Sequence, residues 1–228
     1  ALSAPTEEGA LYEIDTKLRP SGSKGPVAVR LSSFERYYSE EAWTWEILAL
    51  TRLRPVAGDG ALGRHVAEIA KAAITRPRDD QKTRNEVADM RALMQRERPG
   101  RGMWDLKLVA GGFVDIEFIA QYLQLRHAAE RPDVLAPATL DALGRLRLAG
   151  FLEPGHADTL IQAFILWSSV QGLLRLTLEG RQAPDQASDG FKALLVRATG
   201  SADVAELEAR LDRAAAEVYA IFKTLVDE

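Results

Sequence analysis

Hydrophobic and polar residues alternate in two short segments near the start of the chain. In residues 11–18, every second residue from Tyr12 to Leu18 shares one face of an extended chain, and residues 27–31 repeat the pattern. The intervening residues 19–26 are rich in turn formers. We therefore predict a β-hairpin with a wide loop. Because a two-stranded hairpin is marginal in water by itself, these strands should belong to a larger sheet or lie against helices.

From Ser32 onward the pattern changes to one typical of helices. Ser32 and Glu35 have the spacing of a capping box, and apolar residues then recur at three- and four-residue steps. Short breaks with Gly and Pro separate the segments, as in a bundle with compact connections. The fold class predicted is mainly α, a helical bundle preceded by a short β-hairpin, with helices at 34–53, 62–75, 79–96, 113–129, 137–149, 154–179, 187–198 and 202–226.

Composition excludes several classes of protein. The chain has 29 basic and 33 acidic side chains, a formal net charge of -4, so we expect no nucleic-acid binding. The chain has no cysteine, which excludes disulfides and thiolate metal sites and favours the reducing cytoplasm. The longest apolar run, residues 160–170, is shorter than the roughly 20 residues of a membrane span. The start lacks the pattern of a signal peptide and an initiating methionine, which suits an excised fragment.

Polar residues on the predicted first strand and in the loop after it are candidates for nucleotide handling. Carboxylates bind hard cations such as magnesium, whereas lysine, arginine and exposed backbone amides bind phosphate oxygens. An acidic residue beside a lysine on a strand is also a common solvated surface pair, so spacing alone does not decide between these interpretations. The residues concerned are Asp15, Lys17, Arg19, Ser21, Gly22, Ser23, Lys24 and Gly25.

Three long sequence words indicate a family. The words YEIDTKLRPSGSKGP, FERYYSEEAWTWEILALTRLRPVAGD and WDLKLVAGGFVDIEFIAQYLQLRHA occur in this order. They resemble the glutamine synthetase adenylyltransferase and adenylyl-removing enzymes, whose two halves are related nucleotidyltransferases. The first word, together with EEAWTWE, looks like the carboxy-terminal half, which attaches AMP to a tyrosine of glutamine synthetase.

The resemblance implies a polymerase-beta-like catalytic domain. In that family two carboxylates come from a Gly-Ser turn followed by an Asp-x-Asp pair, and a third arrives on a later strand. Asp15 is similar to the third carboxylate and is the candidate catalytic and metal-binding residue; the first two have no counterpart here. Residues 1–60 would be the carboxy-terminal remnant of the catalytic domain and residues 61–228 a helical bundle. Because several carboxylates are needed to hold the magnesium ions, we expect this fragment alone to be inactive.

For the intact enzyme, the resemblance implies magnesium-dependent transfer of AMP from ATP, with Mg2+ as cofactor and ATP as substrate. It also implies glutamine synthetase and a PII-type signal protein as partners, glutamine as an effector, and a cytoplasmic location without membrane contact. Two alternatives stay open. The chain could be a noncatalytic helical interaction module, or it could belong to the adenylyl-removing half, which works by phosphorolysis.

A second polar cluster lies before and within the helix predicted at 113–129. Lys107, Gly111 and Gly112 precede it, and Asp115 and Glu117 lie in its first turns. A helix amino terminus preceded by glycines can receive an anion, so we interpret Lys107, Gly111 and Gly112 as nucleotide-binding residues. The alternative is that the two carboxylates simply suit the positive end of the helix.

Other conspicuous residues favour ordinary roles. We expect Trp43 and Trp45 to pack the catalytic remnant onto the bundle, while the neighbouring carboxylates of Glu40, Glu41 and Glu46 are solvated. The three histidines, His65, His127 and His156, lie far apart in the sequence without the spacing of metal ligands.

Overall fold

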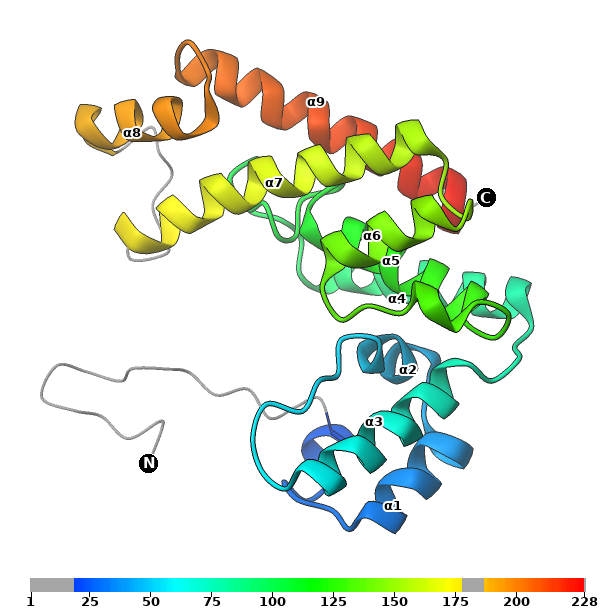
Figure 1. Ribbon diagram of the computed structural model, residues 1–228. Coiled ribbons are helices and arrows are strands. Elements are labelled where there is room, and N and C mark those ends of the chain that lie inside the picture. Colours follow the sequence, from blue (N-terminus) through cyan, green and yellow to red (C-terminus); the bar gives the residue numbers. More distant parts are fainter. Residues whose placement is uncertain (1–18, 178–186, 228) are drawn as a thin grey trace, which may run out of the picture.

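The computed structural model describes residues 19–177 and 187–227, and these residues are mainly helical (Figure 1). Short 3-10 turns lie at Gly22–Lys24 and Pro132–Val134, and π-helical turns at Tyr37–Glu41 and Lys223–Asp227. The helices are α1 (Leu31–Arg36), α2 (Thr44–Leu50), α3 (Gly60–Ile74), α4 (Asp80–Glu97), α5 (Phe113–His127), α6 (Thr139–Leu148), α7 (Pro154–Thr177), α8 (Asp189–Thr199) and α9 (Val204–Phe222).

The predicted β-hairpin is not found in the described residues. Its first strand, residues 11–18, lies outside them. The prediction of the second strand is wrong, because residues 27–30 form no β-ladder and Leu31 begins α1. Val27 is 74% exposed, so the apolar alternation in this segment does not bury a face of a sheet. The mainly helical class is confirmed for the described residues.

The single helix predicted for residues 34–53 is divided in two. After the π-helical turn 37–41, the backbone adopts an extended conformation at Ala42 and Trp43, and α2 then starts at Thr44. The carboxylate of Glu46 stabilises this second start, because it accepts hydrogen bonds from Trp43 N–H (3.0 Å) and from the Tyr37 hydroxyl (2.7 Å). The capping box predicted for Ser32 does not form, because α1 starts earlier, at Leu31, without a side-chain cap.

The later helices begin close to where the sequence predicts. Asp59, Asp79 and Asp203 each accept a hydrogen bond of 2.7 Å from a backbone N–H in the first turn of α3, α4 and α9. These carboxylates satisfy N–H groups that have no partner within the helix, and they favour its positive end. Local side-chain chemistry therefore sets these starts.

The helices form two groups that share one hydrophobic core. In Figure 1, α1 to α3 lie together below the helices from α4 onward, and α7 and α9 run side by side. Contacts of α2 with α4 and α5 join the groups. Trp167 and Tyr122 are the largest fully buried side chains. The apolar stripe predicted for the last helix is confirmed, with Leu207, Leu211, Val218, Ile221 and Phe222 buried. The division at residue 60 stays a prediction.

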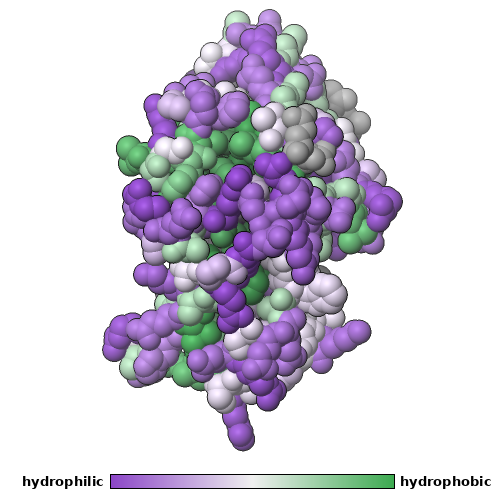
Figure 2. All heavy atoms as spheres, turned by 90° about the vertical axis from the view of Figure 1, so that its right-hand side faces the viewer, coloured by the Kyte–Doolittle hydropathy of each residue, from purple (hydrophilic) through white to green (hydrophobic). Residues whose placement is uncertain are grey.

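One face of the molecule is largely polar (Figure 2). On the face drawn in Figure 2, hydrophilic side chains predominate and hydrophobic ones form smaller patches between them. Among the described helices, none combines the length and the apolar character needed to cross a bilayer.

Candidate functional site

A cleft of about 470 Å³ opens where α2, α5 and α7 meet the loop that precedes α5. This volume is in the range of small-molecule sites, roughly 300–1,000 Å³. Its apolar wall includes Phe113 and Phe164, whose rings meet edge to face at 5.1 Å between centroids. The charged residues around it are Arg52, Lys107, Glu117 and Arg175.

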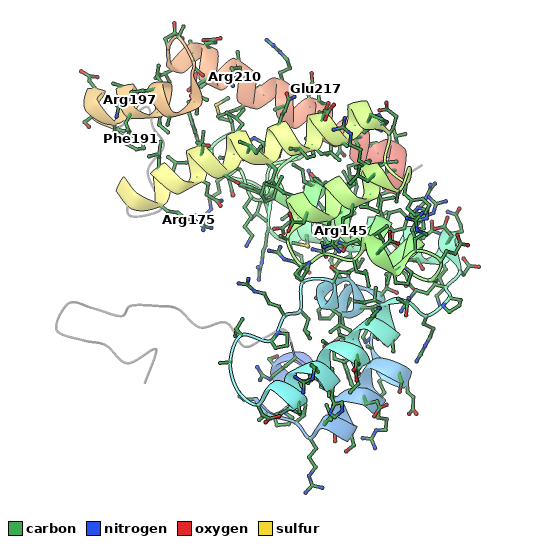
Figure 3. The ribbon with its side chains drawn as sticks, in the orientation of Figure 1. Arg145, Arg175, Phe191, Arg197, Arg210 and Glu217 are labelled. Atoms are coloured by element: carbon green, nitrogen blue, oxygen red, sulfur yellow. The ribbon has the colours of Figure 1, made fainter. Side chains whose placement is uncertain are left out.

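Positive charge predominates in this cleft. Three cationic side chains face one carboxylate, that of Glu117, whose Oε1 lies 2.6 Å from Nη1 of Arg52. Within the described part of the chain, the charged groups of Lys107 and Arg175 form no ion pair. Figure 3 shows Arg175 on the side of α7 that faces away from α9. Two cations of the cleft therefore have no counter-ion among the described residues, which suits an anionic ligand.

A buried ion pair holds the loop that carries Lys107. Arg91 on α4 and Asp115 on α5 are 4% and 0% exposed. Arg91 Nε donates to Asp115 Oδ1, and Nη2 donates to Oδ2 at 3.0 Å. The same Oδ2 accepts the N–H of Gly111 at 2.5 Å. One carboxylate thus connects α4, the loop 106–112 and the first turn of α5.

Two glycines let this loop pack tightly. Gly111 has φ +79°, and a Cβ on it would lie 1.8 Å from the carbonyl oxygen of Ala215 in α9. A Cβ on Gly112 would lie 2.5 Å from the carbonyl oxygen of Leu106. Only glycine fits such close backbone approaches.

The anion interpretation of the second polar cluster therefore separates into two parts. The backbone N–H of Gly111, which could bind an anion at the amino end of α5, instead donates to the carboxylate of Asp115 in the same helix. Gly111 and Gly112 are buried and support the loop, and their contact with nucleotide stays a prediction. Lys107 is exposed and lines the cleft.

The first polar cluster is described only in part. Asp15 and Lys17 lie outside the described residues. Arg19 donates from Nε and Nη2 to the carbonyl oxygen of Gly25 at 3.3 and 3.1 Å, which closes the loop. Ser21 and Gly22 have positive φ, 61° and 53°. With Ser23 and Lys24 they form a turn whose exposed face is rich in hydroxyl, amide and ammonium groups. Binding of phosphate there stays a prediction.

Next to this turn, two tyrosines have perturbed pKa values. Burial raises the pKa of Tyr37, and its hydrogen bond to the Glu46 carboxylate raises it further. Burial raises the pKa of Tyr38 to about 12, with a smaller contribution from the negative charge of Glu46. Both hydroxyls therefore hold their protons more tightly than a free tyrosine does.

The roles expected for the residues of the EEAWTWE word are partly reversed. Glu46 is 5% exposed and accepts hydrogen bonds, so it is a buried structural carboxylate and is not solvated. Trp43, expected to pack, is 70% exposed, and Trp45 is 38% exposed. The physical reason is the break in the helix at Ala42. Trp43 lies in extended backbone before α2 with its indole exposed to solvent, and the Glu46 carboxylate accepts the backbone N–H of Trp43.

The described residues contain no group of three His, Cys, Asp or Glu side chains that could hold a metal ion. Of the histidines, His127 stacks on Phe151 with ring centroids 3.9 Å apart and planes 4° apart. Burial and the nearby charge of Arg126 lower its pKa.

Sequence reasoning missed Arg52 and Arg175. Arg52 lies just after α2 and Arg175 lies on α7, and the cleft that unites them with Lys107 exists because these helices pack around α5. Their spacing in the chain contains no signal of this neighbourhood.

Comparison with known proteins places the chain in a family. Residues 82–226, more than half of the chain, match the family model described as GlnD PII-uridylyltransferase. The chain belongs to this family. Residues 1–69 match a second model, described as glutamate-ammonia ligase adenylyltransferase. The cleft draws on segments matched by both models, since Arg52 lies within residues 1–69 and Lys107 and Arg175 lie within residues 82–226.

Curated relatives match the chain along its whole length. It is 48% identical over 227 residues to the bifunctional glutamine synthetase adenylyltransferase/adenylyl-removing enzyme of Caulobacter vibrioides. It is 44% identical over 226 residues to the enzyme of the same name from Rhodopseudomonas palustris. Each alignment covers 99% of this chain and 23% of the relative, so the chain corresponds to a fragment of these larger enzymes. The family resemblance found in the sequence words is confirmed.

Proposed function

We propose that this chain is part of an enzyme that transfers AMP from ATP to a tyrosine of glutamine synthetase and so regulates nitrogen assimilation. The observation that carries the proposal is the identity of 44–48% along 99% of the chain with relatives named as adenylyltransferases of glutamine synthetase. The first sequence word favours the carboxy-terminal, AMP-attaching half. On this proposal, residues 1–60 complete a polymerase-beta-like catalytic domain, and the helical bundle of residues 61–228 orients it.

The proposed reaction needs metal-bound ATP, and the roles of the site residues follow from their chemistry. Asp15 is the proposed catalytic carboxylate and one ligand of Mg2+, a cation that prefers oxygen ligands and substrate phosphates. The described residues supply no metal site of their own, so the other ligands would come from another part of the intact enzyme. The proposed nucleotide contacts are Lys17, Arg19, Ser21, Gly22, Ser23, Lys24, Lys107, Gly111 and Gly112.

The partners of the intact enzyme are also proposals. Glutamine synthetase would be the protein substrate, and a PII-type signal protein and glutamine would regulate the reaction. The match of residues 82–226 to a model described as a PII-uridylyltransferase supports a connection with PII signalling. We propose that the enzyme acts in the cytoplasm.

The test is adenylylation by a longer polypeptide. This chain is extended at its amino end by the preceding residues of its reading frame, and incorporation of labelled AMP into glutamine synthetase is measured. We expect activity in the extended protein and none in the 228-residue chain. Asp15→Asn in the extended protein should lower kcat by about a hundredfold or more, the scale of removing one electrostatic catalytic group. The exposed Asp212→Asn on α9 is the matched control.

The outcomes separate the possibilities. AMP incorporation by the 228-residue chain itself, or full activity of the Asp15→Asn protein, would contradict the roles assigned here. Release of AMP from adenylylated glutamine synthetase by phosphate would instead identify the adenylyl-removing half. Binding of glutamine synthetase without turnover would favour a noncatalytic module, for which the 70% exposure of Trp43 is the supporting observation.

A further inference from the structure

The cleft has a distribution of charge that a polyphosphate would complement. Arg52, Lys107 and Arg175 come from three segments distant in the sequence, and their side chains border one cavity. Among the described residues that line the cleft, one carboxylate, that of Glu117, opposes these three positive charges. A ligand with two or more negative charges would balance the remaining cations, whereas a neutral ligand would leave them uncompensated.

The cations differ in a way that suits phosphate oxygens. Arg52 uses Nη1 to bind Glu117, and a guanidinium has further N–H donors in a planar fork. Arg175 can present its whole fork, and Lys107 can present three donors. Phosphate groups are commonly bound by such combinations of bidentate arginine and lysine.

The volume of the cleft leaves room for an anion larger than a single phosphate. At about 470 Å³, it exceeds the space that one phosphate needs. The edge-to-face rings of Phe113 and Phe164 line the same cleft and form its apolar wall. Such a wall lowers the local dielectric and strengthens the attraction between the cations and an anion.

The backbone of the loop that carries Lys107 is held in place by neighbouring helices. This loop is tied to α4 and α5 through Asp115, and its Gly111 lies against the backbone of α9. A preorganised cation loses less conformational freedom on binding than one on a mobile loop.

From these observations we infer that Arg52, Lys107 and Arg175 form a polyphosphate-binding site, contributed mainly by the helical part of the chain. This inference rests on the proposed function, because ATP and the pyrophosphate that leaves it are the polyphosphates of that reaction. Glu117 is an internal counter-ion of the site and competes with the ligand for Arg52.

The inference can be tested on the 228-residue chain without any catalysis. Binding of inorganic pyrophosphate is measured by isothermal titration calorimetry at low ionic strength, with inorganic phosphate and sulfate as comparison anions. Pyrophosphate should bind at least about tenfold more tightly than sulfate, because it can reach more than one cation. Its affinity should fall as salt is added, because exposed charges are screened.

Two variants test the named residues with matched controls. Lys107→Ala combined with Arg175→Ala should weaken pyrophosphate binding by at least about tenfold, while Arg197→Ala on α8 should leave it unchanged. Glu117→Gln should tighten binding severalfold, because it removes the competing charge and frees Arg52, while Glu217→Gln on α9 should not. Figure 3 shows both control residues on helices other than α7. Circular dichroism checks that each variant keeps its helices.

Three results would overturn the inference: no pyrophosphate binding by the unaltered chain, equal binding by the double variant, or equal affinity for sulfate and pyrophosphate. The proposed function fails in a different experiment. If the extended enzyme adenylylates glutamine synthetase normally while carrying both alanine substitutions, the inference is wrong and the function stands. If the unaltered extended enzyme is inactive but pyrophosphate binds as described, the function is wrong and the binding site stands.

Discussion

The buried ion pair between Arg91 and Asp115 should be a major determinant of stability. Both side chains are almost inaccessible to water, and the carboxylate also accepts the N–H of Gly111. Removing one partner leaves the other charge buried without compensation, which costs about 3–5 kcal/mol. Domains of this kind have only about 5–15 kcal/mol of unfolding free energy. We therefore expect Arg91→Met and Asp115→Ala each to lower the free energy of unfolding by about 3–5 kcal/mol.

The double variant distinguishes a charge effect from simple loss of contacts. When both charges are removed, neither guanidinium nor carboxylate is left unpaired, so the combined cost should be clearly smaller than the sum of the two single costs. Asp115→Asn should cost less than Asp115→Ala, because its amide oxygen can still accept the N–H of Gly111.

The assay is urea unfolding followed by circular dichroism, with the free energy in water obtained by linear extrapolation. The exposed pair Arg147 and Asp158, 41% and 50% accessible, is the control; Asp158→Asn should cost less than about 1 kcal/mol. The reasoning is refuted if Asp115→Ala costs no more than this control, or if the effects of the two single substitutions simply add.

Two further predictions concern backbone packing and pH. Gly111→Ala should lower the unfolding free energy by more than about 3 kcal/mol, because of the positive φ and the overlap with Ala215, and so lower Tm by about 6–12 °C. The control is Gly144→Ala, whose added Cβ meets no atom within 4 Å and should not lower Tm. Equal Tm values for the two variants would contradict the packing argument. Because the folded pKa of Tyr38 is raised to about 12, its contribution to stability is complete below the unfolded pKa of about 10 and is lost between pH 10 and 12. Urea midpoints should therefore fall over this range less steeply in Tyr38→Phe than in the unaltered chain, and identical slopes would disprove the assignment.

Helix positions were predictable because the signals are local. Asp59, Asp79 and Asp203 cap the helices that the apolar spacing predicts, and the stripe of the last helix is buried as expected. The break at Ala42 was not predictable from spacing, because it depends on Glu46 reaching back to Tyr37 and Trp43. The alternation at residues 27–31 resembled a strand, but no neighbouring strand among the described residues pairs with it.

The candidate site was predictable in part. Lys107 was found because it stands before a glycine pair and a helix start, and it does line the cleft. Arg52 and Arg175 were missed because their proximity depends on how α2 and α7 pack around α5. Of the two interpretations of the second polar cluster, the contact of Asp115 with the Gly111 N–H supports the one in which this carboxylate suits the start of its own helix, while nucleotide contact at Gly111 and Gly112 stays a prediction.

The close approach of Gly111 to Ala215 makes the last helix a mechanical support for Lys107. The carbonyl of Ala215 lies directly against Gly111, so a movement of α9 at this point would press on the backbone of the loop. A force applied to α9, far along the chain from Arg52, would therefore reach the cleft through the loop that carries Lys107 and through α7 and α5, which α9 also contacts.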